Sequence, residues 1–195
     1  MSGAPVAACR HGRQVRGEQV PRSRIQLEHL YALISTDDEL SSVLELPTGI
    51  RDGMSSMGDF SAESQFYQTQ HRHRLVGGYL SRVSGWRKRE NRRNPVMRML
   101  TALSEPAGTA DPDLIASARE ARNRFLSRTC VGYVVIHKRR ASPELQAVAA
   151  DVLRLVPIHD DADYELLRPV DPPACEPRRS VSRSARAGIT MPPRE

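Results

Sequence analysis

The chain has 195 residues, of which 39% are hydrophobic, 27% charged and only 5% aromatic, a composition that suits one ordinary domain. No stretch approaches the roughly 18 uninterrupted apolar residues of a membrane-spanning helix. The apolar run 5–9 is too short for a secretory signal and leads straight into basic residues. The cysteines Cys9, Cys130 and Cys175 are too scattered for a disulfide framework or a CxxC metal site, so we expect no cofactor.

The net charge of +6 and the pI near 9.7 invite a nucleic-acid interpretation, but the basic excess lies at the two ends. Residues 1–24 carry five Arg and one Glu, and residues 171–195 carry five Arg and three acids, whereas residues 25–170 carry nineteen basic and nineteen acidic residues. Both ends are too polar to bury a core. We therefore expect a disordered basic segment 1–24, one domain at 25–170 and a disordered Pro/Arg/Ser-rich tail 171–195. A basic arm for nucleic acid or anionic lipid is the alternative for each end.

Charge is also segregated inside the domain. Residues 25–71 hold eight acids and one base, residues 72–140 sixteen bases and five acids, and residues 141–170 six acids and two bases. Two interpretations fit this pattern. The acidic flanks fold over the basic middle in solvated ion pairs, or the middle forms a basic face for phosphate from lipid headgroups, a phosphorylated carrier or nucleic acid.

The first half of the domain predicts one helix and two strands. Apolar residues recur at helical spacing from Ser23, a plausible cap, to about Ser35. The run 42–47 predicts a short buried strand, and turns follow at 48–49 and 52–53. Residues 75–80 predict a second strand, in which Gly77 and Gly78 suggest a bulge or a close approach of the backbone.

The second half predicts helices alternating with strands. The basic run 87–93 is typical of a surface connection, and helices are expected from Pro95 and over 113–126. The apolar run 130–137 predicts a central strand, residues 142–155 a capped helix, and residues 164–168 a last strand. This order favours an α/β fold with a small, mostly parallel sheet of about four strands flanked by helices.

One segment carries most of the functional information: Gln68-Thr69-Gln70-His71 followed by Leu75-Val76-Gly77-Gly78-Tyr79-Leu80-Ser81-Arg82. It resembles a Tyr-Gln-Thr-x-His, spacer, Gly-Tyr-x-Ser-Arg pattern of uncharacterised bacterial polytopic membrane proteins related to lipid-dependent glycosyltransferases. In that family the pattern lies in a soluble extracytoplasmic domain after the last membrane helix. The segments 43–53, 131–137 and 164–169 are similar in order and spacing, and the resemblance covers about residues 27–170.

The resemblance implies a domain detached from its membrane region. Members of that family carry many membrane helices before this domain, and the acidic residues credited with sugar transfer lie in loops of that membrane part. This chain has no such membrane part. We therefore expect that it comes from a truncated gene or a split reading frame, and that it has no transferase activity alone. The resemblance places the domain outside the cytoplasmic membrane. The chain as written, with no export signal, is expected to stay in the cytoplasm.

Residues 68–82 supply the candidate ligand or phosphate site, and no catalytic residue is assigned. The amides and hydroxyls suit sugars, the arginines suit phosphate, and a tyrosine can stack on a sugar. The candidates are Gln68, Thr69, His71, Arg74, Tyr79, Ser81 and Arg82. The structural alternative is a turn at Ser81 and an ion pair of Arg82 with Glu45 or Asp52. A metal could bind His71 and His73, but the sequence offers no third ligand at a suitable spacing. A hydrolase triad with Ser81 and His71 would need a nucleophile elbow, and no Gly-x-Ser-x-Gly is present.

The leading hypothesis is a non-catalytic accessory domain that interacts with other molecules or guides substrate. Its partners would be a membrane surface or a lipid-linked phosphate sugar, together with the membrane-embedded region of a related protein. Arg72, Arg74, Arg82 and the run 87–93 would attract the phosphate. The alternative is a basic nucleic-acid-binding protein that uses the Arg cluster 82–98, opposed by the shortage of aromatic residues for stacking.

Overall fold

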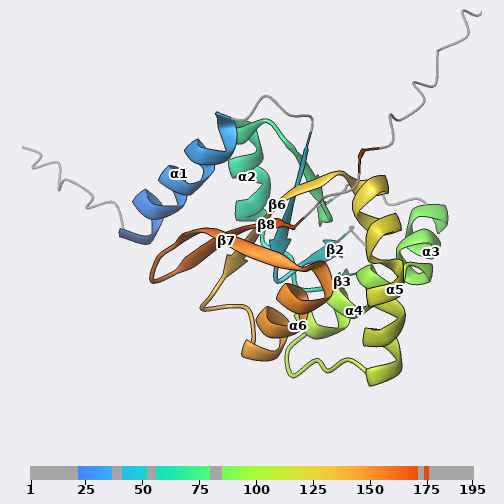
Figure 1. Ribbon diagram of the computed structural model, residues 1–195. Coiled ribbons are helices and arrows are strands. Elements are labelled where there is room, and N and C mark those ends of the chain that lie inside the picture. The colour runs from blue at the N-terminus through green and yellow to red at the C-terminus, as the bar shows by residue number, and fades with distance from the viewer. Residues whose placement is uncertain (1–21, 37–40, 52–55, 80–84, 171–173, 176–195) are drawn as a thin grey trace, which may run out of the picture.

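The computed structural model describes residues 22–36, 41–51, 56–79, 85–170 and 174–175 (Figure 1). Its helices are α1 (Arg22–Ser35), α2 (Ala62–His71), α3 (Gly85–Arg93), α4 (Pro95–Ser104), α5 (Pro112–Thr129) and α6 (Pro143–Leu153). Its strands are β1 (Ser42–Leu46), β2 (Gly49–Arg51), β3 (Ser56–Gly58), β4 (Arg74–Val76), β5 (Gly78–Tyr79), β6 (Val131–His137), β7 (Leu155–Asp160) and β8 (Tyr164–Pro169). None of the helices in these ranges has the length and apolar character needed to cross a membrane.

A five-stranded sheet in the order β4-β1-β6-β8-β7 forms the centre of the fold. β1 pairs in parallel with both β4 and β6, and β8 pairs antiparallel with β6 and β7. Parallel strands need crossover connections. The connection from β1 to β4 contains α2, and the connection from β4 to β6 contains α3, α4 and α5. The predicted α/β class is confirmed.

A second, three-stranded sheet in the order β3-β2-β5 continues from the end of β1. Glycines permit its tight packing. Gly77 has φ +98°, and a Cβ atom there would lie 2.7 Å from the carbonyl oxygen of Gly49. The close backbone approach predicted at this glycine is therefore an approach to another segment of the same chain.

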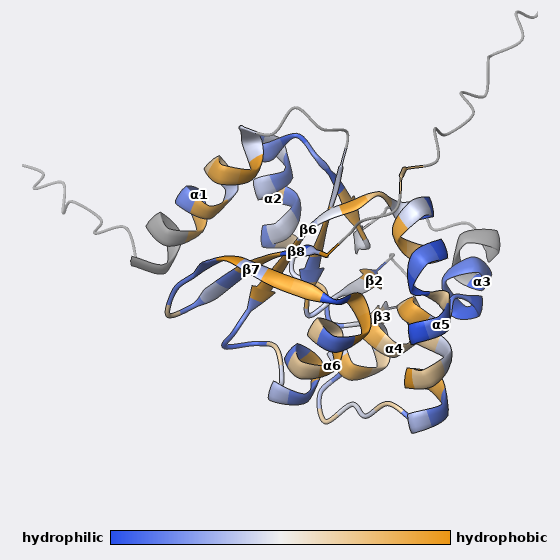
Figure 2. Ribbon diagram, in the orientation of Figure 1, coloured by the Kyte–Doolittle hydropathy of each residue, from blue (hydrophilic) through white to orange (hydrophobic). Residues whose placement is uncertain are grey.

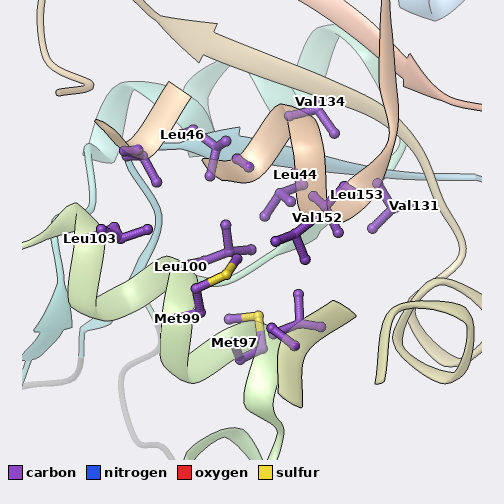
Figure 3. Packing of buried hydrophobic residues seen from close by; sticks show 14 of the residues in the cluster. Leu44, Leu46, Met97, Met99, Leu100, Leu103, Val131, Val134, Val152 and Leu153 are labelled. Atoms are coloured by element: carbon purple, nitrogen blue, oxygen red, sulfur yellow. The ribbon is translucent and has the colours of Figure 1, made fainter. Parts of the chain in front are cut away.

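The two faces of the main sheet are covered by different helices (Figure 1). α4, α5 and α6 cover one face, and Figure 3 shows side chains of α4 and α6 packed against those of β1 and β6 around Leu44, Leu100 and Val134. The other face packs against α1 and α2, which we call the α1–α2 layer. Alternation along the strands explains this division, because neighbouring residues such as Leu44 and Glu45 point to opposite faces.

The structure confirms several predicted elements and corrects others. α4, α5, β6 and β8 lie where they were expected, whereas Ser23 lies inside α1 and not at its cap. The prediction that the basic run 87–93 is a surface connection is wrong, since this run belongs to α3. α2 and β7 were not predicted, and Gly77 divides the expected strand 75–80 into β4 and β5. The predicted tails lie almost entirely outside the described residues.

Candidate functional site

Four polar side chains meet between the sheet and the α1–α2 layer, and we call them the Glu45 centre: Tyr31, Glu45, Ser64 and His137. The Tyr31 hydroxyl donates to Glu45 Oε1, and the Ser64 hydroxyl donates to Glu45 Oε2. His137 Nε2 lies 3.1 Å from the same Oε2. All four residues are almost sealed from solvent, with exposed fractions of 0%, 6%, 4% and 5% in that order.

The positions of these residues follow from the local structure. Glu45 in β1 and His137 in β6 lie at the carboxyl ends of adjacent parallel strands and on the same face of the sheet. Ser64 lies in the first turn of α2, after the cap Ser61, whose hydroxyl accepts from the Glu63 N–H. Tyr31 belongs to the buried stripe of α1. One carboxylate therefore joins β1 to β6 and to both helices of the α1–α2 layer.

Hydrogen bonds keep Glu45 ionised. Burial alone would raise the pKa of this carboxyl, but the hydrogen bond and charge of His137, followed by the hydroxyls of Ser64 and Tyr31, lower the pKa below its ordinary value. The pKa of Tyr31 is raised, first by burial and then by the charge of Glu45, so this phenol stays a neutral donor. Breaking such a buried pair is costly, because the remaining charge has no water to solvate it.

Two further histidines extend the buried polar cluster along α2. His71 Nδ1 accepts from the backbone N–H of His73 at 3.1 Å, and no described group hydrogen-bonds its Nε2. Burial is the main reason that the pKa of His71 falls to about 4, so the ring is neutral at pH 7. His73 Nε2 lies 3.1 Å from the Ile34 carbonyl in the last turn of α1, and its Nδ1 lies 3.2 Å from the Ser41 hydroxyl. His73 thus fastens the end of α1 to the start of β1.

The predicted ligand residues do not converge on one cavity among the described side chains. Gln68 donates to the His73 carbonyl, Thr69 donates to the Phe66 carbonyl within α2, and Arg74 is exposed at the start of β4. Tyr79 belongs to β5, but its side chain lies outside the description. Ser81 and Arg82 lie outside the described residues altogether.

One structural interpretation of the sequence is left untested, and another is wrong. Glu45 pairs with His137 among the described residues, whereas Arg82, expected to pair with an acid such as Glu45 or Asp52, lies outside them. His71 ends α2 and His73 follows the left-handed residue Arg72, so the two histidines do not share a strand face. No group of three His, Cys, Asp or Glu side chains that could hold a metal ion occurs in the described ranges.

The Glu45 centre itself was missed, although two sequence signals pointed toward it. Glu45 is a single acid inside an otherwise apolar strand, and His137 closes the most apolar strand of the chain. Charged residues are rarely buried without a partner. The partner residues Tyr31 and Ser64 could not be found in this way, because they lie on helices whose docking is decided by the tertiary fold.

Basic residues just after β6 are neutralised by acids. Lys138 pairs with Asp160, Arg139 Nε lies 2.5 Å from Asp163, and Arg140 pairs with Asp59 at 2.8 Å. Ligands of open α/β sheets usually bind beyond the carboxyl ends of parallel strands. Here that edge carries paired charges, which leaves little positive potential for a phosphate.

Unpaired positive charge lies instead on α3, α4 and α5. Arg128 of α5 pairs with Glu90 of α3 at 3.0 Å, and Arg119 pairs with Asp151 of α6 at 2.7 Å. The remaining exposed arginines of these helices form no ion pair with any other described residue: Arg89, Arg92, Arg93, Arg98 and Arg124. Figure 2 shows the coloured part of α3 and the neighbouring turns of α5 as hydrophilic residues.

A shallow cavity of about 260 Å³ lies between α4 and α5. Arg98 lines it together with Asp111, Asp113, Leu114 and Ser117. Two carboxylates beside one guanidinium make this cavity a poor site for an anion.

Comparison of the chain with protein-family models, with curated proteins and with solved structures finds no match.

Proposed function

We propose that this chain is a non-catalytic accessory domain, similar to the soluble extracytoplasmic part of glycosyltransferase-like membrane proteins, that holds a phosphate-bearing partner at a membrane surface. One observation carries the proposal. The ionisable groups of the Glu45 centre are enclosed and mutually satisfied, whereas five exposed arginines of α3, α4 and α5 form no ion pair with a described residue: Arg89, Arg92, Arg93, Arg98 and Arg124.

The enclosure of the Glu45 centre supports a structural role for it. A catalytic acid or base must reach the reacting atom at hydrogen-bond distance, directly or through one water molecule. Both oxygens of Glu45 are already occupied by groups of the protein, and its exposed fraction is 6%. The carboxylate acts as a joint between elements and not as a reagent.

The exposed arginines support an anionic partner. Guanidinium groups bind phosphate in a forked geometry, and the cytoplasmic or extracytoplasmic headgroup layer of a membrane presents many phosphates in one plane. A lipid-linked phosphate sugar would present the same group at the same level. Free inorganic phosphate would offer no such array.

Vesicle flotation tests the proposal. The full chain is mixed at low salt with phosphatidylcholine vesicles that are either plain or doped with polyprenyl phosphate or phosphatidylglycerol. We expect recovery with both doped vesicles and little with the plain ones. Equal recovery in all three samples, or turnover of a polyprenyl-phosphate sugar by the chain alone, would contradict the proposal.

A further inference from the structure

α3 is unusual among the helices because Trp86 is the only apolar side chain in its sequence. Its nine residues include five basic residues and one acid. In its described second half Arg89, Arg92 and Arg93 are exposed, and Glu90 and Asn91 are half-buried. A helical segment that is polar all round, as 89–93 is, needs another source of stability.

The charges of α3 oppose its own folding. Arg89 lies three residues before Arg92 and four before Arg93, so these like charges share one side of the helix. Such pairs destabilise a helix to about the same small extent as opposite charges stabilise it. Among the described residues, α3 is attached by the ion pair of Glu90 with Arg128 and by the Asn94 N–H, which donates to the Glu90 carbonyl. A surface that repels itself in this way is stabilised when an anion neutralises it.

The neighbouring helix continues the same surface. Arg124 and Arg128 are four residues apart on α5, and Arg128 reaches α3 through Glu90. Arg124 therefore lies on the side of α5 that faces α3, and Figure 2 shows the two helices next to each other. We call the set Arg89, Arg92, Arg93 and Arg124 the α3–α5 face.

We infer that α3 is a membrane-docking helix whose arginines bind the phosphates of an anionic lipid surface. This inference rests on the proposed function and assigns the membrane contact to the α3–α5 face, and not to Arg72 and Arg74 near the resemblance segment. A headgroup layer needs no pocket, and the cavity between α4 and α5 is lined by two carboxylates that do not suit an anion. Within 89–129, where side chains are described, the one aromatic residue is Phe125, which is buried and offers a base no stacking surface.

The test compares matched variants of the full chain. Arg92→Gln/Arg93→Gln removes two charges from α3 but keeps good helix formers, and Arg92→Lys/Arg93→Lys keeps the charge. Arg51→Gln/Arg74→Gln removes the same charge from exposed positions elsewhere. The Arg-rich ends are identical in all variants, so their contribution to binding cancels in the comparison.

Partitioning onto phosphatidylcholine vesicles with phosphatidylglycerol is measured by flotation at moderate salt. Each basic residue near an anionic membrane contributes about a fivefold gain, so we expect the α3 Gln variant to bind roughly thirtyfold more weakly. The Lys variant should bind like the natural chain, and the Arg51/Arg74 variant should lose much less. Thermal unfolding should show the α3 Gln variant at least as stable as the natural chain, because a like-charge repulsion is removed.

The possible failures are distinguishable. If the natural chain does not float with anionic vesicles, the proposed function fails. If it floats but the α3 and Arg51/Arg74 variants lose affinity equally, the assignment to α3 is overturned and the proposed function survives. If duplex or single-stranded nucleic acid binds at the same salt more tightly than vesicles and with the same dependence on Arg92 and Arg93, the membrane as occupant is overturned.

Discussion

The two faces of the main sheet are built on different physical principles. The face under α4, α5 and α6 buries nineteen clustered apolar residues, none of them a tyrosine. The face under the α1–α2 layer buries a cluster of ten, of which four are tyrosines, and adds the Glu45 centre and two histidines. The first face is held by non-directional burial, the second by hydrogen bonds that require particular partners.

The difference predicts different tolerance to change. An apolar core accepts substitutions that preserve volume, because no atom in it needs a specific partner. A buried polar network fails when a single member is lost, because every remaining donor or acceptor stays desolvated without compensation. Four experiments test whether the two faces differ in this way.

The largest effect is expected from Glu45→Leu. The change leaves the hydroxyls of Tyr31 and Ser64 and the ring of His137 buried without an acceptor, and losing one partner of a buried pair costs about 3–5 kcal/mol. Leu44→Met, at the preceding residue but on the opposite face, should lower the free energy of unfolding by less than about 1.5 kcal/mol. Both are measured by denaturant unfolding. Similar costs for the two variants would mean that the faces do not differ.

Leu100→Ala should come next. Leu100 has no exposed surface and lies within the apolar cluster, so truncation removes buried area and leaves a cavity, at a cost of about 2–5 kcal/mol. Leu100→Met should recover most of that loss. Because no titratable group lies in this cluster, the free energy of unfolding should fall by the same amount from pH 7 to acid pH in the alanine variant and in the natural chain. A different fall would mean that the apolar face carries a titratable contribution.

A smaller and pH-dependent effect is expected at His71. Its pKa is lowered from 6.5 to about 4 in the folded chain, so the unfolded chain binds the proton first as the pH falls. The contribution of His71 to stability is complete above pH 6.5 and is lost progressively toward pH 4. Its upper limit is about 1.4 kcal/mol for each unit between the two pKa values.

His71→Asn tests this dependence, because its side-chain oxygen can still accept from the His73 N–H. The variant should show a flatter fall in the free energy of unfolding between pH 6.5 and 4 than the natural chain. The Glu45 carboxyl, whose pKa is lowered from 4.5, remains in both proteins and adds slope only at the acid end of this range. Parallel pH curves for the two proteins would rule out His71 as a source of acid sensitivity.

The smallest effects concern the helix caps. Ser61 caps α2 and Ser142 caps α6, and replacing either by alanine should cost about 1 kcal/mol. Hydrogen exchange distinguishes the faces. Ser61→Ala should speed exchange in the α1–α2 layer and leave α4, α5 and α6 protected, whereas uniform acceleration everywhere would show that the sheet and both helical layers open only as one unit.

Predictability differed between the two faces. α4, α5 and β6 were predicted because their apolar residues follow helical or continuous strand patterns that burial alone explains. α2 was missed because its buried residues are Ser64, Tyr67 and His71, which carry little hydrophobic signal. β7 was missed because Val156 and Ile158 of this edge strand are largely exposed and Pro157 interrupts the pattern.

The basic residues also differed in how far their roles could be predicted from the sequence. The basic middle of the chain was visible from composition, and the structure divides it into paired residues after β6 and unpaired arginines on α3, α4 and α5. No local pattern could make this division. An ion pair such as Arg140 with Asp59 joins residues far apart in the chain, so only the topology brings them together.

The sequence by itself determined the α/β class, most of the apolar elements and the segregation of charge, because periodicity and composition are local properties. Only the tertiary structure showed that Glu45 is a satisfied buried anion, that His71 is neutral, and that the run 87–93 belongs to a helix. These properties depend on which distant groups surround a side chain. Desolvation and hydrogen bonding act over a few ångströms in space, whatever the separation along the chain.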